Sequence, residues 1–116
     1  MPSVEALWLV KFGDHQSPGQ VDNGGVLVLE SGRGFGGDSG FAYVGTYEVS
    51  GDKFIGSFSI TQFDPDMESV WGPSITEANL EAELTREDDM MHGFMKVVGA
   101  NLPSLPLYLV RFKDLP

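Results

Sequence analysis

Short stretches in which apolar and polar side chains alternate run along this chain, and glycine or proline interrupts them at close intervals. Alternation with a period of two is the pattern of a β-strand with one buried face. With 15 glycines and seven prolines among 116 residues, the chain leaves little room for long helices. We therefore expect an all-β protein, with strands over residues 4–12, 26–30, 41–49, 53–63, 79–86, 90–98 and 105–112.

Residues 75–88, ITEANLEAELTRED, form the segment in which a helix competes with a strand, because Leu, Ala and Glu are good helix formers. Leu80, Ala82 and Leu84 nevertheless recur at every second position, which favours a strand. About eight antiparallel strands in meander order lose their exposed edges by closing into a small barrel or a two-sheet sandwich. We predict the closed antiparallel β-barrel, as a single domain over residues 1–116.

A closed barrel has an interior that is either filled by side chains or left open for one small apolar ligand. The inward-facing candidates for lining such a cavity are Trp8, Phe58, Met91 and Met95. Aromatic and methionine side chains on an inward face more often form a core than a ligand pocket. Both outcomes stay open at this point.

The first strand is apolar on both faces. Val4, Ala6, Trp8, Val10 and Phe12 share one face, and Leu7 and Leu9 lie on the other with Glu5 and Lys11. Leu7 and Leu9 therefore need cover from another element of the chain or from a partner subunit. This pattern favours a homodimer with these two residues in its interface.

The sequence GRGFGG matches the G-x-G-x-x-G pattern of nucleotide-binding loops, with glycines at positions 32, 34 and 37. That pattern binds phosphate at the start of a helix, but here an alternating strand follows. We therefore interpret the run as a glycine-rich turn, with Gly36, Gly37 and Asp38 as turn residues. Gly51 is expected to form the next hairpin turn, and Gly45 lies in the strand between the two turns.

Residues 37–40, GDSG, reproduce the surroundings of the nucleophile in trypsin-like proteases. Such a serine needs a histidine base and an acid that orients it. His15 lies in a polar loop and His92 in a strand, and neither belongs to a recognisable base motif. The expected role of Asp38 and Ser39 is to bond the turn backbone, and we predict no enzymatic activity.

Metal and cofactor sites are not expected. The chain has no cysteine, which excludes disulfides and thiolate ligands. Asp64, Asp66 and Glu68 alternate like the first ligands of a calcium loop, but Ser69 and Ile75 stand where that loop needs a glycine and a bidentate acid. We predict neither a metal nor a cofactor.

The net charge of −10 disfavours direct binding to nucleic acid or to anionic membranes and suits a basic protein partner. Glu87, Asp88 and Asp89 form an expected hairpin tip that is either a solvated turn or a docking point for such a partner. The N-terminus carries neither a basic leader nor a long apolar run, so we expect a protein that is soluble and cytoplasmic.

The turn and strand pattern resembles that of the GrlR family, negative regulators of type III secretion gene expression. The resemblance is carried by Gly36-Gly37-Asp38, by Tyr43-x-Gly45-x-Tyr47, by the turn at residues 50–52 and by the opening segment ALWLVKFG. It extends thinly through LEAELTRE to the closing LYLVRF.

The resemblance implies an eight-stranded barrel like those of lipocalins and calycins, which dimerises and binds a helix-turn-helix transcription regulator. The acidic partner-binding turn of that family matches residues 49–52, where Asp52 is the acid present. Our leading expectation is a non-enzymatic binding protein that acts through contacts of Asp52 and of the tip at residues 87–89. The alternative is a barrel that carries or senses a small apolar ligand.

Overall fold

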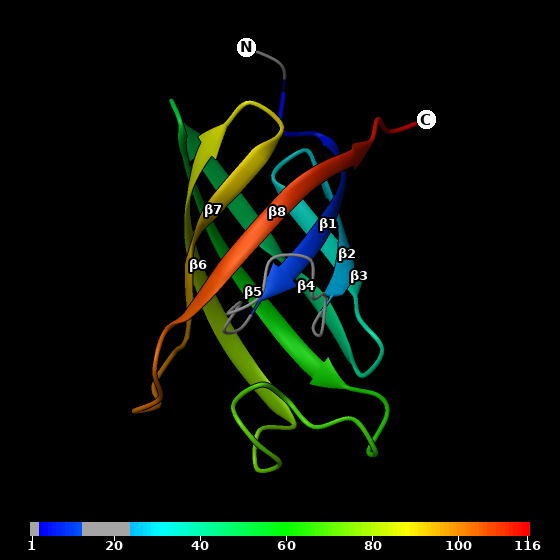
Figure 1. Cartoon of the computed structure of the whole chain (residues 1–116), viewed down its shortest axis with the longest axis vertical. Helices are drawn as coiled ribbons and strands as arrows, with labels where there is room; N and C mark the ends of the chain where they lie inside the picture. The colour runs from blue at the N-terminus through cyan, green and yellow to red at the C-terminus, as the bar shows by residue number, and fades with distance from the viewer. Residues whose placement is uncertain (1–2, 13–23) are drawn as a thin grey trace.

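The computed structural model describes residues 3–12 and 24–116. These residues form eight strands: β1 (Ala6–Phe12), β2 (Gly24–Glu30), β3 (Arg33–Gly37), β4 (Phe41–Ser50), β5 (Lys53–Gln62), β6 (Glu77–Glu87), β7 (Met90–Val97) and β8 (Leu105–Lys113). Each strand pairs antiparallel with the next, and β8 pairs with β1, which closes the barrel (Figure 1). The predicted all-β closed barrel in meander order is confirmed. No helix in the described part of the chain is long and apolar enough to cross a membrane.

The barrel has two different ends. Residues 3–5, the hairpin turns at 31–32, 51–52 and 88–89, and the C-terminus lie at one end, which we call the termini end (Figure 1). The turn at 38–40, the long loop at 63–76 and the loop at 98–104 lie at the other end, which we call the cavity end.

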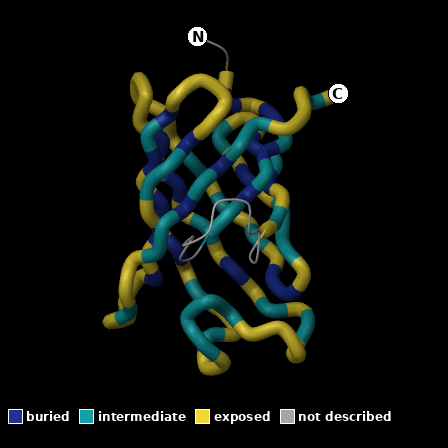
Figure 2. The backbone as a smooth tube through the Cα atoms, viewed as in Figure 1, coloured by how far each residue is buried: buried dark blue, intermediate teal, exposed yellow. Residues whose placement is uncertain are grey.

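The strand expected within residues 75–88 is present as β6. Leu80, Ala82 and Leu84 are all buried, while the glutamates between them are exposed. Figure 2 shows a similar alternation of buried and more exposed positions on other strands, including β5 and β7. The period of two therefore decided correctly between strand and helix.

The glycine run is a strand rather than the turn that we expected from its composition. Residues 33–37 form β3, so the prediction that Gly36 and Gly37 are turn residues is wrong. The turn lies earlier, at Ser31 and Gly32, whose φ angles of 53° and 80° fit a two-residue hairpin. Gly51, with a φ of 61°, is a turn residue as predicted, and Gly45 lies in β4 as predicted.

The glycines of this region make room for one aromatic ring on the inner wall. A Cβ on Gly34 would lie 2.7 Å from Cζ of Phe58, one on Gly45 2.9 Å from its Cγ, and one on Gly56 2.8 Å from its Cε1. Three neighbouring strands thus leave out their side chains where the Phe58 ring packs. At Gly45 the backbone of β5 is closer still, with the Ser57 carbonyl oxygen 2.2 Å from the Cβ position. Close packing, and not phosphate binding or a turn, explains why glycine is required at these positions.

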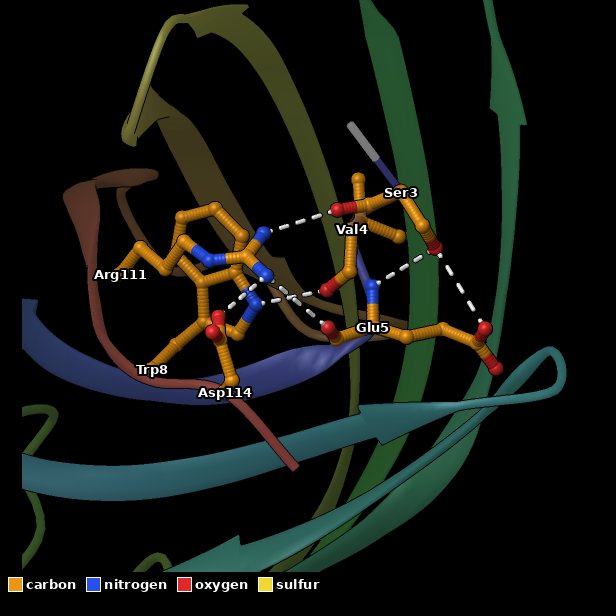
Figure 3. Close-up of polar contacts among 6 residues, drawn as sticks. All are labelled: Ser3, Val4, Glu5, Trp8, Arg111 and Asp114. Carbon is orange, nitrogen blue, oxygen red and sulfur yellow. Dashed lines mark hydrogen bonds and ion pairs between the residues drawn. The ribbon is translucent and has the colours of Figure 1, made fainter. Parts of the chain in front are cut away.

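The filled part of the core lies toward the termini end. The fully buried side chains there include Trp8, Leu29 and Met91. Trp8 Nε1 donates a hydrogen bond of 2.8 Å to the Val4 carbonyl, which satisfies the indole N–H inside the protein (Figure 3).

Arg111 ties the N-terminal residues to the last strand. Its Nη1 donates to the Ser3 carbonyl at 2.9 Å, and its Nη2 donates to the Glu5 carbonyl at 3.4 Å and to Asp114 Oδ1 at 2.9 Å (Figure 3). Arg111 is also the pairing partner of Trp8 across β1 and β8. Residues from the two ends of the sequence are thereby joined at the termini end.

Candidate functional site

The other part of the interior is a cavity of about 770 Å³. It extends from the middle of the barrel to the cavity end, and all eight strands together with residues 38–40 and 67–71 contribute to its wall. The apolar side chains that line it include Phe54, Phe58, Ile60, Leu80, Ala82, Leu84, Met95 and Leu107. A ligand in this space would contact mainly hydrocarbon and aromatic surface.

The four residues expected to line a cavity separate into two pairs. Phe58 and Met95 line it, as predicted. Trp8 and Met91 are completely buried in the filled part of the core, so their assignment to a cavity is wrong. All four side chains point inward, but strand alternation reports the face of a residue and not its height along the barrel axis.

One polar pair lies in the cavity wall, made by Asp38 and Tyr43. Asp38 Oδ1 accepts hydrogen bonds from the backbone N–H of Gly40 at 2.8 Å and of Phe41 at 2.7 Å. Its Oδ2 accepts a hydrogen bond from the Tyr43 hydroxyl. The predicted role of Asp38 in bonding the turn backbone is therefore confirmed, and the contact with Tyr43 is an addition that the turn interpretation did not include.

Burial raises the pKa of the Tyr43 hydroxyl above its usual value, and the hydrogen bond to Asp38 and the charge of Asp38 raise it further. Tyr43 is therefore a neutral donor to Asp38 at physiological pH. Gly25 of β2 packs directly against the pair, since a Cβ there would lie 3.1 Å from the Tyr43 hydroxyl oxygen. A side chain at this position would displace the pair from the wall.

Residues 67–71 form another part of the wall at the cavity end. Trp71 Nε1 donates to the Pro103 carbonyl at 3.1 Å, and Gln62 Nε2 donates to the Met67 carbonyl at 2.8 Å. Ser69 Oγ donates to the Gly72 carbonyl at 2.9 Å. These hydrogen bonds hold the segment to β5 and to the loop before β8.

Asp64 and Asp66, which alternate like the first ligands of a calcium loop, lie in a turn. Asp64 Oδ1 accepts a hydrogen bond of 3.0 Å from the backbone N–H of Asp66. Across residues 3–12 and 24–116, no three His, Asp or Glu side chains come together as a group that could hold a metal ion.

Ser39 and His92 lie in different parts of the barrel. Ser39 is exposed in the turn at the cavity end, whereas His92 is on the outer face of β7 and contacts Glu87 at 3.3 Å. His15 lies outside the described residues. The geometry therefore does not bring His92 to Ser39 as a catalytic base.

The acidic residues expected to bind a partner lie together at the termini end. Asp52, Glu87, Asp88 and Asp89 are all exposed. Their two hairpins are neighbours, because the Asp52 carbonyl accepts a hydrogen bond of 2.7 Å from the backbone N–H of Arg86. This acidic surface is at the opposite end of the barrel from the cavity.

Leu7 and Leu9 lie half-buried on the outer face of β1, as alternation predicted. They pair with Val28 and Val26 of β2, and the apolar surface continues to Phe35 of β3 and Val44 of β4. Phe35 and Val44 are 47% and 62% exposed. The homodimer expected from Leu7 and Leu9 stays a prediction, and this wider outer face is the surface that it would cover.

Comparison with models of known protein families finds no match for the sequence. No curated protein matches it either.

Proposed function

We propose that this protein is a non-enzymatic barrel that binds one small apolar molecule in its cavity, as a carrier or a sensor. The observation that carries the proposal is the cavity of about 770 Å³ with its largely apolar wall. Ligand pockets in proteins have volumes of about 300–1,000 Å³ and combine apolar walls with a few polar groups. The lining side chains leave part of the interior unfilled, while Trp8, Leu29 and Met91 are fully buried in the other part.

The test introduces a large side chain into the cavity by a substitution in its wall. Ala82 is buried, lines the cavity and lies between Gly56 and Met95 on the neighbouring strands. Ala82→Phe places a ring in the open space, whereas Ala42→Phe makes the same change at an exposed position on β4 and serves as the matched control. The neutral fluorescent probe N-phenyl-1-naphthylamine reports binding, and native mass spectrometry gives its stoichiometry.

We expect the wild-type protein to bind one probe molecule. Ala82→Phe is expected to weaken binding by about tenfold or more, because the ring occupies volume that the probe needs. Ala42→Phe should bind the probe as the wild type does. No binding by the wild type, or equal binding by the two variants, would refute the proposal.

A second candidate function is binding of a transcription regulator, as in the GrlR family that the sequence resembles. What supports it is the adjacency of Asp52 to the tip at residues 87–89, which gathers exposed acids at one end of the barrel. The experiment replaces these four acids by their amides and measures affinity for a basic helix-turn-helix regulator from the same genome. Amide replacement of exposed acids at positions 68, 77, 81 and 83 removes the same charge from other surfaces and is the control.

Weaker binding with the first set and unchanged binding with the second would support this function. Equal loss with both sets would indicate a general charge effect, and no binding by the wild type would exclude the regulator tested. Because the acidic surface and the cavity lie at opposite ends, the two candidate functions can be tested independently.

A further inference from the structure

The polar side chains of the cavity wall decide which end group a ligand can carry. Besides Asp38 and Tyr43, the described polar side chains of the lining are Lys11, Ser39, Glu68, Ser69 and the indole of Trp71. The Ser69 hydroxyl donates to the Gly72 carbonyl and the Trp71 indole to the Pro103 carbonyl, and Ser39 and Glu68 are exposed. The Asp38–Tyr43 pair is therefore the half-buried polar group against which a ligand in the cavity would pack.

This pair offers only hydrogen-bond acceptors. A carboxylate has about four acceptor positions on its two oxygens. Gly40 and Phe41 occupy both positions on Oδ1, and Tyr43 occupies one on Oδ2, so one position on Oδ2 remains. Tyr43 uses its single hydrogen on Asp38, which leaves its oxygen as an acceptor. A ligand group can form hydrogen bonds with these two side chains only by donating them.

The charges around the cavity favour the same kind of group. Asp38 and Glu68 both contribute to the wall. Lys11 is the basic residue of the described lining, and alternation along β1 places it on the outward face, since Val10 before it is buried. A ligand carboxylate would meet a negative charge and two acceptors in a largely apolar wall.

We infer that the cavity takes an amphiphile or aromatic molecule whose polar end is a hydrogen-bond donor, an ammonium or a hydroxyl group, placed against Asp38 and Tyr43. It discriminates against molecules of the same size that end in a carboxylate. This inference rests on the proposed ligand-binding function and adds the class of ligand.

The experiment compares decylamine, 1-decanol and decanoate, which share a ten-carbon chain, as competitors of N-phenyl-1-naphthylamine at moderate salt. The wild-type protein should bind decylamine most tightly and decanoate most weakly, with a difference of about tenfold or more. If the probe binds and the three competitors displace it equally, or decanoate displaces it best, the inference is wrong while the proposed function stands. If neither the probe nor any competitor binds, the proposed function fails.

Asp38→Asn tests the pair directly. Asparagine Oδ1 can keep both hydrogen bonds from the turn, while its amide N–H₂ replaces the Oδ2 acceptor by a donor. The preference for decylamine over decanoate should then fall by about fivefold or more. Glu83→Gln, on the exposed outer face of β6, changes the net charge equally and should leave the preference within about twofold.

Two outcomes would overturn the assignment of the selectivity to this pair. One is an unchanged preference in a folded Asp38→Asn protein, and the other is an equal change in Glu83→Gln. If Asp38→Asn does not fold, Tyr43→Phe replaces it: removal of the acceptor oxygen should weaken 1-decanol binding, and unchanged binding would count against the pair.

Discussion

Replacing Gly34 or Gly45 by alanine tests whether the glycines of β3 and β4 exist to seat the Phe58 ring. A Cβ on Gly34 would lie 2.7 Å from Cζ and 2.8 Å from Cε2 of Phe58, which are atoms at the far edge of the ring. A Cβ on Gly45 would lie 2.2 Å from the Ser57 carbonyl oxygen and 2.7 Å from Cα of Phe58, which are backbone atoms. The two variants therefore meet groups of very different mobility.

The loss of folding free energy in each variant depends on which atoms must move to make room for the new Cβ. Normal carbon contacts are about 3.5–4.0 Å, so the Phe58 ring must shift by about 1 Å in Gly34→Ala. The ring borders the cavity and has space to do so. Overpacking costs about 1–3 kcal/mol, and Gly34→Ala should lie near the lower limit. Gly45→Ala must separate the paired backbones of β4 and β5, so its cost should reach about 3 kcal/mol or more.

The assay is urea unfolding at constant pH, with the free energy of unfolding extrapolated from the midpoint and the m-value. A double-mutant cycle with Phe58→Leu separates the two mechanisms, because leucine removes the ring edge but not the backbone. In the Phe58→Leu background, Gly34→Ala should lose the part of its cost that comes from the ring and keep the part that comes from Leu29 Cδ2, 3.0 Å from the Cβ position. Gly45→Ala should keep most of its cost.

Equal destabilisation by the two glycine variants would refute this account of the packing. So would a cost of Gly34→Ala that is the same with leucine as with phenylalanine at position 58.

Three further predictions concern the termini end, the polar pair and the outer face. Arg111→Met removes the hydrogen bonds to Ser3, Glu5 and Asp114. We expect the free energy of unfolding in urea to fall by about 2 kcal/mol and amide exchange near the N-terminus to become faster. Unchanged exchange would contradict this prediction. Because the pKa of Tyr43 is raised in the folded state, its stabilising contribution is complete below the ordinary pKa of about 10 and is lost as pH rises further. Unfolding followed from pH 9 to 11 should therefore show falling stability, with a smaller fall in Tyr43→Phe. If the outer face forms a homodimer, Phe35→Lys combined with Val44→Lys should weaken dimerisation about tenfold or more in sedimentation experiments, and a dimer of unchanged affinity would exclude this face.

Much of the fold could be predicted from the sequence because strand alternation and hairpin turns are local properties. Leu80, Ala82 and Leu84 were assigned to one face of a strand, and all three are buried. Gly51 was assigned to a hairpin turn, and its positive φ is the backbone reason for glycine there. The period of two and the need for positive φ depend only on neighbouring residues, so they are visible in the sequence.

The course of β3 could not be predicted in this way. Its sequence is RGFGG, in which no inward side chain marks the alternation. What identifies the segment as a strand is its packing against other strands, where Gly45 and Gly56 also make room for Phe58. Recognising it requires the register that places Gly34 opposite Gly45 and Gly45 opposite Phe58.

Only part of the candidate site could be predicted from the sequence. Asp38 was correctly assigned to the turn backbone, since its partners are two and three residues away. Its contact with Tyr43, and the lack of a free hydrogen-bond donor in the pair, depend on how β4 leaves that turn and on the packing against Gly25.

The sequence by itself determined which residues of the alternating strands face the interior, because alternation along a strand is a local property. The tertiary structure alone decided which of these residues fill the interior and which surround a cavity. Trp8 and Met95 both point inward, but Trp8 packs at the end that Arg111 joins to residues 3–5, while Met95 borders the cavity. The height of a side chain along the barrel axis is set by strand stagger and by contacts between distant parts of the chain, and no local pattern records either.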